Sequence, residues 1–515
     1  MKTGNPKDID IVSKRAISSN LKEKGFFSPT FILSIVGLCI ICLLSIFLPE
    51  MAKHVFENSR RWSVINLDWL FVSLANLFLL VTIVLALSPL GKKRLGNQAK
   101  EYSNLAWFSM IITTGFGLTL VFWGVAEPAA FYSDWWGAPL GQTPKTPEAA
   151  PLALAASLYH WGLHPWAMYA MMALAVAYAT YNLGLPLKLS SAFQPLLAGR
   201  FAKPIGSIID SLAVIATLCG VATTMGLGAR QASNALSHLY DIPNTLLSQS
   251  AVIILASILL VIILQKGINK GIKRFSLINL VLLLVFAFIL FLVADMSGAL
   301  SLMLSTPQVY AENFVAMSLW DDRSDTKFFH GWTVFYWVWW FSWAPFIGIF
   351  IAKISQGRSI RECVFAVVVV PTIFTFIWFS ILGGVGLDQL LNNVGSILTP
   401  RLSPSTALFQ MLAILPLSQW LSLLGILLVL FCFVSTSDTS LYVINKLTSD
   451  NPDSTNKLVT QFWVLVQGVV ALSLLAFGGK KALESVQSAS LMIGVIMCVL
   501  LLVASVIFIY NLKRK

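Results

Sequence analysis

Aromatic side chains are concentrated in two short stretches of this sequence, and these stretches point most directly to a chemistry. The chain contains 17 Trp in all. The two stretches hold Trp337, Trp339, Trp340 and Trp343 in one, and Trp161, Trp166 and Tyr169 in the other. Several aromatic faces around one pocket suit a quaternary ammonium group. Such a group has no N–H to donate, and cation–π attraction holds it with about 0.5–2 kcal/mol per ring.

A glycine-containing stretch at residues 113–119 offers a partner for an anionic group. Gly115 and Gly117 each weaken a helix by up to about 1 kcal/mol relative to Ala. Backbone N–H groups released there, together with helix dipole ends, would bind a carboxylate without any basic side chain. We therefore expect Gly115 and Gly117 to lie at the anionic end of a zwitterionic ligand.

Hydroxyl and carboxylate side chains form a third group within apolar segments. Thr217, Ser435 and Thr436 carry oxygens that suit Na⁺, although hydrogen bonding between helices explains the same residues, and composition alone favours that explanation. Glu127 and Asp438 are the carboxylates most clearly inside such segments, where ionisable residues are functional candidates. For Glu127, capping of freed backbone donors is an equal alternative.

The elements that must position these residues are membrane-spanning helices. The chain is 57% hydrophobic and 11% charged, whereas soluble domains carry about 25% charged residues. Its apolar segments are about 20 residues long, enough to cross ~30 Å of hydrocarbon as helices. We predict an all-α integral membrane protein with twelve spans, at 29–49, 68–90, 106–132, 152–181, 205–236, 246–265, 275–303, 332–352, 362–387, 417–444, 458–478 and 485–511.

The basic residues predict the orientation of these spans. Both termini and the loops that follow even-numbered spans hold 25 Lys and Arg, and the opposite loops hold 9. Cytoplasmic loops of membrane proteins carry an excess of Lys and Arg. We therefore expect a multi-pass protein of the cytoplasmic (inner) membrane, with both termini in the cytoplasm. The net charge of +12 is spread over many short loops, which argues against nucleic-acid binding. The six Cys all fall inside predicted spans and are interpreted as small buried apolar residues.

Two spans that lie five apart, 106–132 and 332–352, carry helix-disrupting residues. If the first two spans are peripheral, spans 3–7 and 8–12 form two halves of opposite orientation. Interrupted helices at matching positions of two halves indicate a transporter binding site. The expected organisation is a cytoplasmic tail 1–28, two peripheral helices in 29–105, a first repeat 106–303, an external interfacial segment 304–331, a second repeat 332–511 and a basic tail 512–515.

The same stretches resemble the betaine/choline/carnitine transporter family, a branch of the leucine-transporter fold. The resemblance covers nearly the whole chain and is carried by residues 122–128, 160–169, 266–271 and 332–361. It implies twelve helices with a 5+5 inverted repeat and a homotrimer. It also implies a central box of Trp161, Trp166, Tyr169 and Trp340, with Trp339 and Trp343 beside it on the pathway.

In sodium-coupled members of the family, the resemblance implies two ion sites. One corresponds to Thr113, Phe116, Ser435 and Thr436, and the other to Thr217, Val221 and Phe346. Val221 lacks the expected hydroxyl, which puts a two-sodium stoichiometry in doubt. Thr119 stands where choline carriers often have Asp, which favours a zwitterion over a bare cation. The tail after the last predicted span is short, unlike the long basic tails of osmosensing members.

The sequence therefore predicts a secondary transporter that imports glycine betaine or a similar quaternary-ammonium solute. It uses no cofactor, and Na⁺ is the expected coupling ion. Proton symport and ion-independent exchange of choline, carnitine or a related compound are the alternatives, with Arg274 as a basic side chain that could replace Na⁺. A channel, a membrane enzyme and a receptor are less consistent with the residues. The only close His pair, His160 and His164, lies beside the aromatic cluster, and no appended signalling domain is evident.

Overall fold

The computed structural model of the chain describes residues 28–194, 196–197, 199–399, 401–449 and 457–514, and the side chains of residues 117–119, 238 and 478–480 lie outside this description. Most of the expected N-terminal tail 1–28 and the last residue of the expected tail 512–515 also lie outside it. Within the described ranges every regular element is a helix, and only two isolated β-bridges occur. The predicted all-α class is therefore confirmed for these residues.

The first part of the chain contains α2 (Pro29–Phe47), α3 (Pro49–Asn66), α4 (Asp68–Leu87), α5 (Asn104–Ser133), α6 (Ala149–Trp161), α7 (Leu163–Tyr181), α8 (Ala202–Tyr240), α9 (Leu246–Gln265), α10 (Lys273–Val293) and α11 (Ser297–Ser318). The second part contains α12 (Thr326–Phe328), α13 (Phe335–Ile354), α14 (Ile360–Val364), α15 (Val370–Leu391), α16 (Ala407–Leu412), α17 (Ser418–Thr448), α18 (Lys457–Ser473) and α19 (Gly479–Arg514). Short 3₁₀ turns are η1 (Pro89–Lys92), η2 (Pro139–Gly141), η3 (Leu189–Phe193) and η4 (Gly199–Phe201). Stretches of π-helix are η5 (Ile268–Ile272), η6 (Phe329–Val334), η7 (Phe365–Val369) and η8 (Leu474–Gly478).

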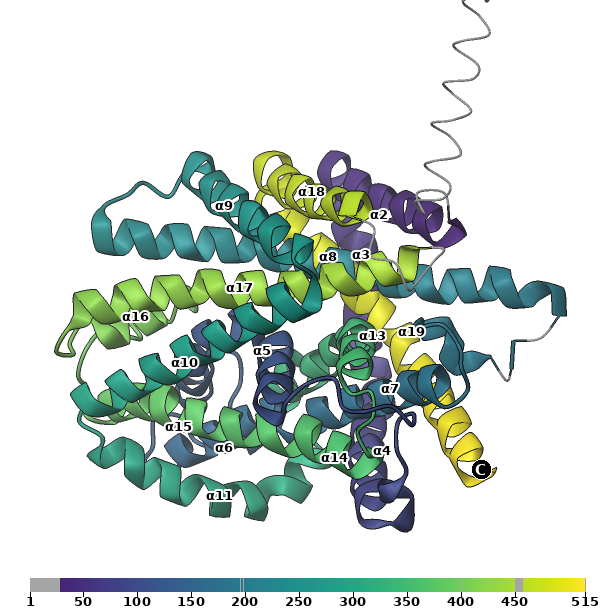
Figure 1. Ribbon diagram of the computed structural model, residues 1–515. Helices are drawn as coiled ribbons and strands as arrows, with labels where there is room; N and C mark the ends of the chain where they lie inside the picture. The colour runs from purple at the N-terminus through teal and green to yellow at the C-terminus, as the bar shows by residue number, and fades with distance from the viewer. Residues whose placement is uncertain (1–27, 195, 198, 400, 450–456, 515) are drawn as a thin grey trace, which may run out of the picture.

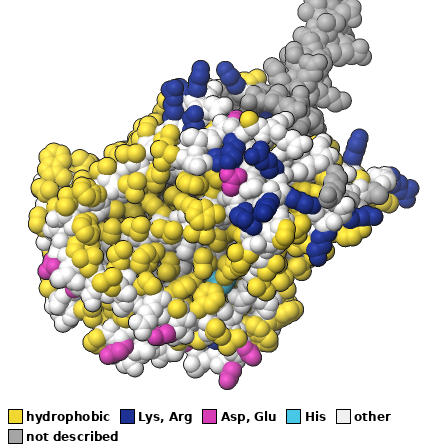
Figure 2. All heavy atoms as spheres, turned by 60° about the horizontal axis from the view of Figure 1, so that its bottom comes forward, with side chains coloured by type: hydrophobic (Ala, Val, Ile, Leu, Met, Phe, Trp, Pro, Cys, Tyr) yellow, Lys and Arg dark blue, Asp and Glu magenta, His cyan; other side chains and the backbone are white. Residues whose placement is uncertain are grey.

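Ten helices of the described chain are long and apolar enough to cross a membrane, or eleven when the bent α5 is counted as one span. They correspond in order to eleven of the twelve expected spans. The exception is the fourth, 152–181, which consists of two shorter helices, α6 and α7. The chain is thus a multi-pass helical membrane protein. The face shown in Figure 2 agrees, because apolar side chains cover much of it, with Lys and Arg gathered toward one end and Asp and Glu mostly toward the other.

Two helices outside the spans depart from the sequence interpretation. The connection expected at 50–67 is almost entirely the helix α3, which packs along α19. The segment expected at 304–331 contains a helix, α11, but this helix begins at Ser297, inside the expected seventh span. It packs on α6 and α15. The span ends earlier because α10 stops at Val293, ahead of Asp295, whose carboxylate accepts a hydrogen bond from the Ser297 N–H at 3.0 Å.

The interruptions of the helices also differ from the expected symmetric pair. The third span is bent, with 56° between its halves Asn104–Phe116 and Leu120–Ser133. The expected break in the eighth span is wrong, because Thr326–Ile354 is one span that begins in π-helix and keeps Pro345 inside a continuous α-helix. The complete break lies in the fourth span instead, at Gly162.

The broken and bent helices lie in the interior. In Figure 1, α5 is in the middle of the molecule, with α17 on one side of it and α15 on the other, and it packs against both. α13 packs along α7, and α17 packs along α8. This arrangement brings the two aromatic stretches of the sequence face to face.

Candidate substrate site

The fourth span breaks at Gly162, whose backbone (φ −99°, ψ −123°) is outside the helical region. A Cβ at this position would lie 2.5 Å from the carbonyl oxygen of Leu158, so only glycine fits without displacement. Pro165, which the sequence suggested as the bending residue, lies instead in the first turn of α7. Proline is tolerated there because the first N–H groups of a helix have no partner within the helix.

The break frees backbone carbonyls at the end of α6, and side chains of other helices take them up. The indole Nε1–H of Trp340 on α13 donates to the carbonyl of His160 at 2.9 Å. The Thr375 hydroxyl on α15 donates to the carbonyl of Trp161 at 3.3 Å. An unpaired buried carbonyl costs about 1–3 kcal/mol. The interruption of the helix therefore fixes the orientation of the Trp340 ring.

The four residues expected to form an aromatic box come together in the structure. The rings of Trp161 and Trp340 lie 5.1 Å apart at 73°, and those of Tyr169 and Trp340 lie 6.2 Å apart at 88°. Trp166 and Tyr169 share a helix face, with ring centroids 5.6 Å apart. All four are buried, and the Tyr169 hydroxyl has no hydrogen-bond partner among the described residues. The box therefore combines aromatic faces with one unsatisfied polar group.

Glu127 on α5 connects the box to its surroundings. Its Oε2 accepts a hydrogen bond from Trp161 Nε1 at 2.8 Å and from the Tyr336 hydroxyl at 2.5 Å. Its Oε1 lies 3.3 Å from His160 Nδ1, and the other ring nitrogen of His160 lies 2.9 Å from the Thr333 hydroxyl. The carboxylate thus orients box residues rather than capping the α5 backbone, which resolves the two alternatives left by the sequence.

Gly115 has a steric role that its sequence context did not suggest. A Cβ on Gly115 would overlap the ring of Trp166, so the absence of a side chain lets this ring approach α5. The neighbouring Phe116 ring lies 5.0 Å from Trp166. The bend of α5 comes directly after Phe116 in the chain. Beyond the bend, the Leu120 carbonyl accepts a hydrogen bond from Trp378 Nε1 at 3.0 Å. Gly117 lies in the stretch 117–119, outside the described side chains.

Trp339 and Trp343 lie beside the box on α13. Trp339 stacks near Trp340 at 6.0 Å, and Trp343 is 6.5 Å from Trp340 and 5.4 Å from Phe346. Tyr336, which the sequence interpretation did not select, stacks on Trp340 at 5.7 Å and 16°. Its spacing of four residues from Trp340 placed both on one helix face and was the available signal.

The residues of the first expected ion site lie on two helices that pack together, α5 and α17. Ser435 on α17 is buried, and its hydroxyl has no hydrogen-bond partner in the described part of the chain. The Thr436 hydroxyl donates to the carbonyl of Cys432 at 3.3 Å, and the Thr113 hydroxyl donates to the carbonyl of Ser109 at 2.9 Å. The carboxylate of Asp438, one turn from Ser435, is also buried.

The residues of the second expected ion site also lie on packed helices, α8 and α13. The Thr217 hydroxyl donates to the Ala213 carbonyl at 2.7 Å, which leaves its oxygen able to accept. Val221 offers no oxygen side chain, and Phe346 is fully buried. Arg274, considered as a replacement for Na⁺, is exposed at the start of α10. Among the described residues, no group of three His, Cys, Asp or Glu side chains could hold a metal ion.

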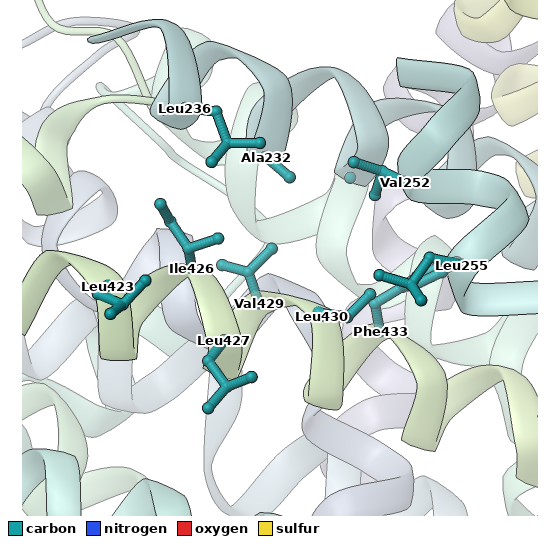
Figure 3. Close-up of a pocket in the computed structure, with 11 residues that line it drawn as sticks. Ala232, Leu236, Val252, Leu255, Leu423, Ile426, Leu427, Val429, Leu430 and Phe433 are labelled. Carbon is teal, nitrogen blue, oxygen red and sulfur yellow. The ribbon is translucent and has the colours of Figure 1, made fainter. Parts of the chain in front are cut away.

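A separate apolar cavity of about 200 Å³ lies between α8, α9 and α17 (Figure 3). Its walls include Ala232, Val252, Leu427 and Phe433, and none of its lining residues carries a polar or charged side chain. Such a cavity stays dry or takes up hydrocarbon. It offers nothing to an ionic solute, so the box remains the candidate substrate site.

Comparison with known proteins defines the class. Residues 29–515 match the model of the betaine/carnitine/choline family of transporters, and the chain belongs to this family. It is a transporter and not an enzyme.

Among similar proteins is glycine betaine transporter 1 of Vibrio parahaemolyticus, 38% identical over 516 residues that cover 98% of both chains. A glycine betaine/proline/choline/ectoine transporter of the same organism is 37% identical over 98% of this chain and 91% of its own. The high-affinity choline transport protein of Escherichia coli is 31% identical over 91% of this chain and 70% of its own. A solved Na⁺-coupled sialic acid symporter matches 86% of each chain with a TM-score of 0.48 and 13% identity. A structural similarity at that level carries no conclusion.

Proposed function

We propose that this protein imports a small quaternary-ammonium zwitterion, glycine betaine or a close analogue, by alternating access. The observation that carries the proposal is the buried box of Trp161, Trp166, Tyr169 and Trp340, held by the broken fourth span and by Glu127. The names of the two Vibrio parahaemolyticus relatives, both of which include glycine betaine, support the same substrate class.

The box suits a trimethylammonium group better than a primary amine. Its ring pairs meet edge to face, and a ring face that a cation contacts is worth about 0.5–2 kcal/mol, more when desolvated. The nearest carboxylate, Glu127, is already engaged by Trp161, Tyr336 and His160. An amine would leave its N–H donors unsatisfied in such a box, whereas a quaternary ammonium has none.

The anionic end of the substrate needs a donor, and Tyr169 provides a candidate. Its buried hydroxyl has no partner among the described residues, so it is free to donate to a carboxylate. Gly115 and Gly117, at the bend of α5, are the other candidates through their backbone N–H groups. This combination favours a betaine over choline, which has no carboxylate.

Sodium symport is the proposed coupling. The hydroxyl of buried Ser435, which has no partner among the described residues, supports an ion site at Thr113, Phe116, Ser435 and Thr436. Val221 has no hydroxyl, so a second Na⁺ site at Thr217 and Phe346 would have one ligand oxygen fewer and would bind Na⁺ more weakly. Proton symport and ion-independent exchange of choline or carnitine are the competing proposals.

The proposed architecture has twelve spans, with α6 and α7 together as the fourth. Its domains are two peripheral helices in 29–105, repeats of opposite orientation at 106–303 and 332–511, and an external segment 304–331 between them. Both termini would be cytoplasmic, which the gathering of Lys and Arg at one end of the molecule supports (Figure 2). A homotrimer in the cytoplasmic membrane, in contact with its lipids, completes the proposal.

Uptake of labelled glycine betaine into proteoliposomes tests the proposal. An inward Na⁺ gradient, an inward proton gradient and no gradient are compared, with internal unlabelled substrate as a further condition. Accumulation driven by Na⁺ supports symport. Proton-driven accumulation, or exchange alone, would support the proposed substrate and contradict Na⁺ coupling. If betaine does not move under any condition, the proposed substrate is wrong, and choline and carnitine would then be tested.

A further inference from the structure

The first part of α8 extends beyond the ends of neighbouring spans. The Ser211 hydroxyl of α8 donates to the carbonyl of Thr30, in the first turn of α2, at 3.2 Å. The Ser28 hydroxyl, which caps α2, donates to the carbonyl of Thr448, the last residue of α17, at 2.6 Å. These contacts place the start of α2, the end of α17 and Ser211 at one level, which marks one face of the membrane. Residues 202–210 project about 13 Å past this level, at 1.5 Å per residue.

One side of this projection is covered by the chain itself. The N–H and the hydroxyl of Ser190, in η3, donate to the two carboxylate oxygens of Asp210 on α8 at 2.9 and 2.8 Å. A Cβ on Gly206, one turn before Asp210, would lie 3.3 Å from the Ser190 Cβ. η3 packs in turn on α19. The projecting end of α8, which Figure 1 shows at the right beyond α2 and α17, is therefore held in place from one side.

The opposite side of the projection is apolar and uncovered. Phe201, at the N-cap of α8, is followed by Ile205 and Ile208, and this spacing puts the three residues, the apolar stripe, on one helix face. Their side chains are 57%, 42% and 51% exposed. Apolar side chains that face hydrocarbon need no explanation, but the apolar stripe lies outside the level marked by Ser211. A contiguous apolar patch in that position indicates an interaction surface.

Basic side chains surround the apolar stripe. The segment 182–209 contains Lys188, Arg200 and Lys203 and no Asp or Glu. Arg200 and Lys203 are exposed and form no ion pair within the described part of the chain. The Arg200 guanidinium lies 4.7 Å from the centroid of the Phe201 ring, so positive charge and apolar surface adjoin. Lys and Arg are also visible on the projection at the right of Figure 2.

An anionic lipid surface fits both properties of the projection. Ile208 and Ile205 lie about 4.5 and 9 Å past the level of Ser211. This is close to the depth of lipid headgroups, which extend about 5–7 Å past the hydrocarbon on each side of a bilayer. Lys and Arg near such a surface are attracted to anionic lipids, and their long stems let the charges reach the phosphates. An acidic protein would have to displace the headgroups that already surround the base of the apolar stripe.

We propose that the projecting start of α8 is a docking element that binds anionic phospholipid at the membrane surface. The apolar stripe enters the headgroup region, and Arg200 and Lys203 pair with lipid phosphates. Docking fixes one end of the helix that carries Thr217 further along. The inference involves neither the substrate nor the coupling ion, so it holds or fails independently of the proposed function.

Spin labelling tests the docking in the intact protein. The label is attached at Ile205→Cys in a Cys39→Ser background, because Cys39 is the exposed cysteine of the described chain. The protein is reconstituted in bilayers of phosphatidylcholine alone or of phosphatidylcholine mixed with phosphatidylglycerol. Collisions with oxygen report immersion of the label in lipid, and collisions with a water-soluble nickel complex report exposure to water. We expect oxygen collisions to dominate in the mixed bilayers and nickel collisions in phosphatidylcholine alone.

The double variant Arg200→Gln with Lys203→Gln should return the label to water in the mixed bilayers. Each basic residue removed should lower the ratio of immersed to exposed label roughly five-fold. Lys270→Gln, at an exposed lysine of η5, is the matched control and should leave this ratio unchanged.

Three results would overturn the docking: a label exposed to water in both bilayers, a label equally immersed in both, or no effect of the double variant. A label that neither reagent reaches would also overturn it, because protein, such as a second copy of this chain, would then cover the apolar stripe.

Discussion

The carboxylate of Glu127 accepts a hydrogen bond from the indole of Trp161 at 2.8 Å, across two helices whose residues lie 34 positions apart. The same oxygen accepts the Tyr336 hydroxyl, so three helices meet at one acceptor. Charge-assisted hydrogen bonds are about twice as strong as neutral ones and hold a preferred geometry. The rings that would bind a cation are therefore positioned by a buried anion that does not need to touch the substrate.

Replacement of Glu127 by Gln tests this positioning. The amide oxygen can still accept from Trp161 and Tyr336, but it carries no charge, so both hydrogen bonds lose their charge assistance. A charge-assisted hydrogen bond is worth about 1.5–3 kcal/mol, and we expect substrate affinity to fall about ten- to a hundred-fold. Glu312→Gln, at an exposed carboxylate of α11, should have no effect. Unchanged KM in Glu127→Gln would show that the carboxylate does not orient the box.

Trp340→Ala should abolish saturable uptake while the protein still inserts in the membrane. The change removes a ring that contacts both Trp161 and Tyr169, and it leaves the His160 carbonyl without its donor. Trp340→Phe restores a ring face but not the N–H, and should recover part of the affinity. The matched control is Trp420→Ala, because Trp420 is 71% exposed on α17. Substrate affinity equal to wild type in Trp340→Ala would remove this residue from the site.

Gly115→Ala should lower substrate affinity through Trp166 and not through the backbone N–H. The added methyl group overlaps the Trp166 ring, so the ring must move out of the box. Overpacking of this kind typically costs about 1–3 kcal/mol. Gly425→Ala on α17 is the control, because its new Cβ would meet no atom closer than 3.5 Å. Tryptophan fluorescence with titrated substrate measures the affinity, and identical binding curves for both variants would contradict the steric role.

The double variant Ser435→Ala with Thr436→Ala should weaken the dependence of uptake on Na⁺. Ser435 is buried, and its hydroxyl has no hydrogen-bond partner in the part of the chain that the structure describes. The two residues supply the side-chain oxygens that α17 offers to the proposed ion site. We expect the half-saturating Na⁺ concentration to rise about ten-fold or more, as expected for a lost ligand oxygen. Ser440→Ala on the same helix, where the hydroxyl donates locally to Ser437, is the control. An unaltered sodium response in the double variant would place the ion elsewhere.

The sequence by itself determined the class of the protein and most of its spans, and its resemblance to a known family predicted the four box residues. Hydrophobic length and the spacing of Trp166 and Tyr169 are local properties, so they can be read along the chain. Trp161 and Trp340 were assigned to the box through the resemblance to the betaine/choline/carnitine transporter family, and the structure brings their ring centroids to 5.1 Å.

What only the tertiary structure decided is how those residues are held. The break at Gly162, the steric role of Gly115 and the alignment of Tyr336 with the box depend on atoms of other helices. Glu127 was ambiguous in the sequence because a buried carboxylate can serve its own backbone or a distant donor. In the structure, Glu127 accepts hydrogen bonds from Trp161 on α6 and Tyr336 on α13, which are distant donors. Contacts between residues far apart in the chain depend on how the helices pack, and no periodicity of a single helix encodes that packing.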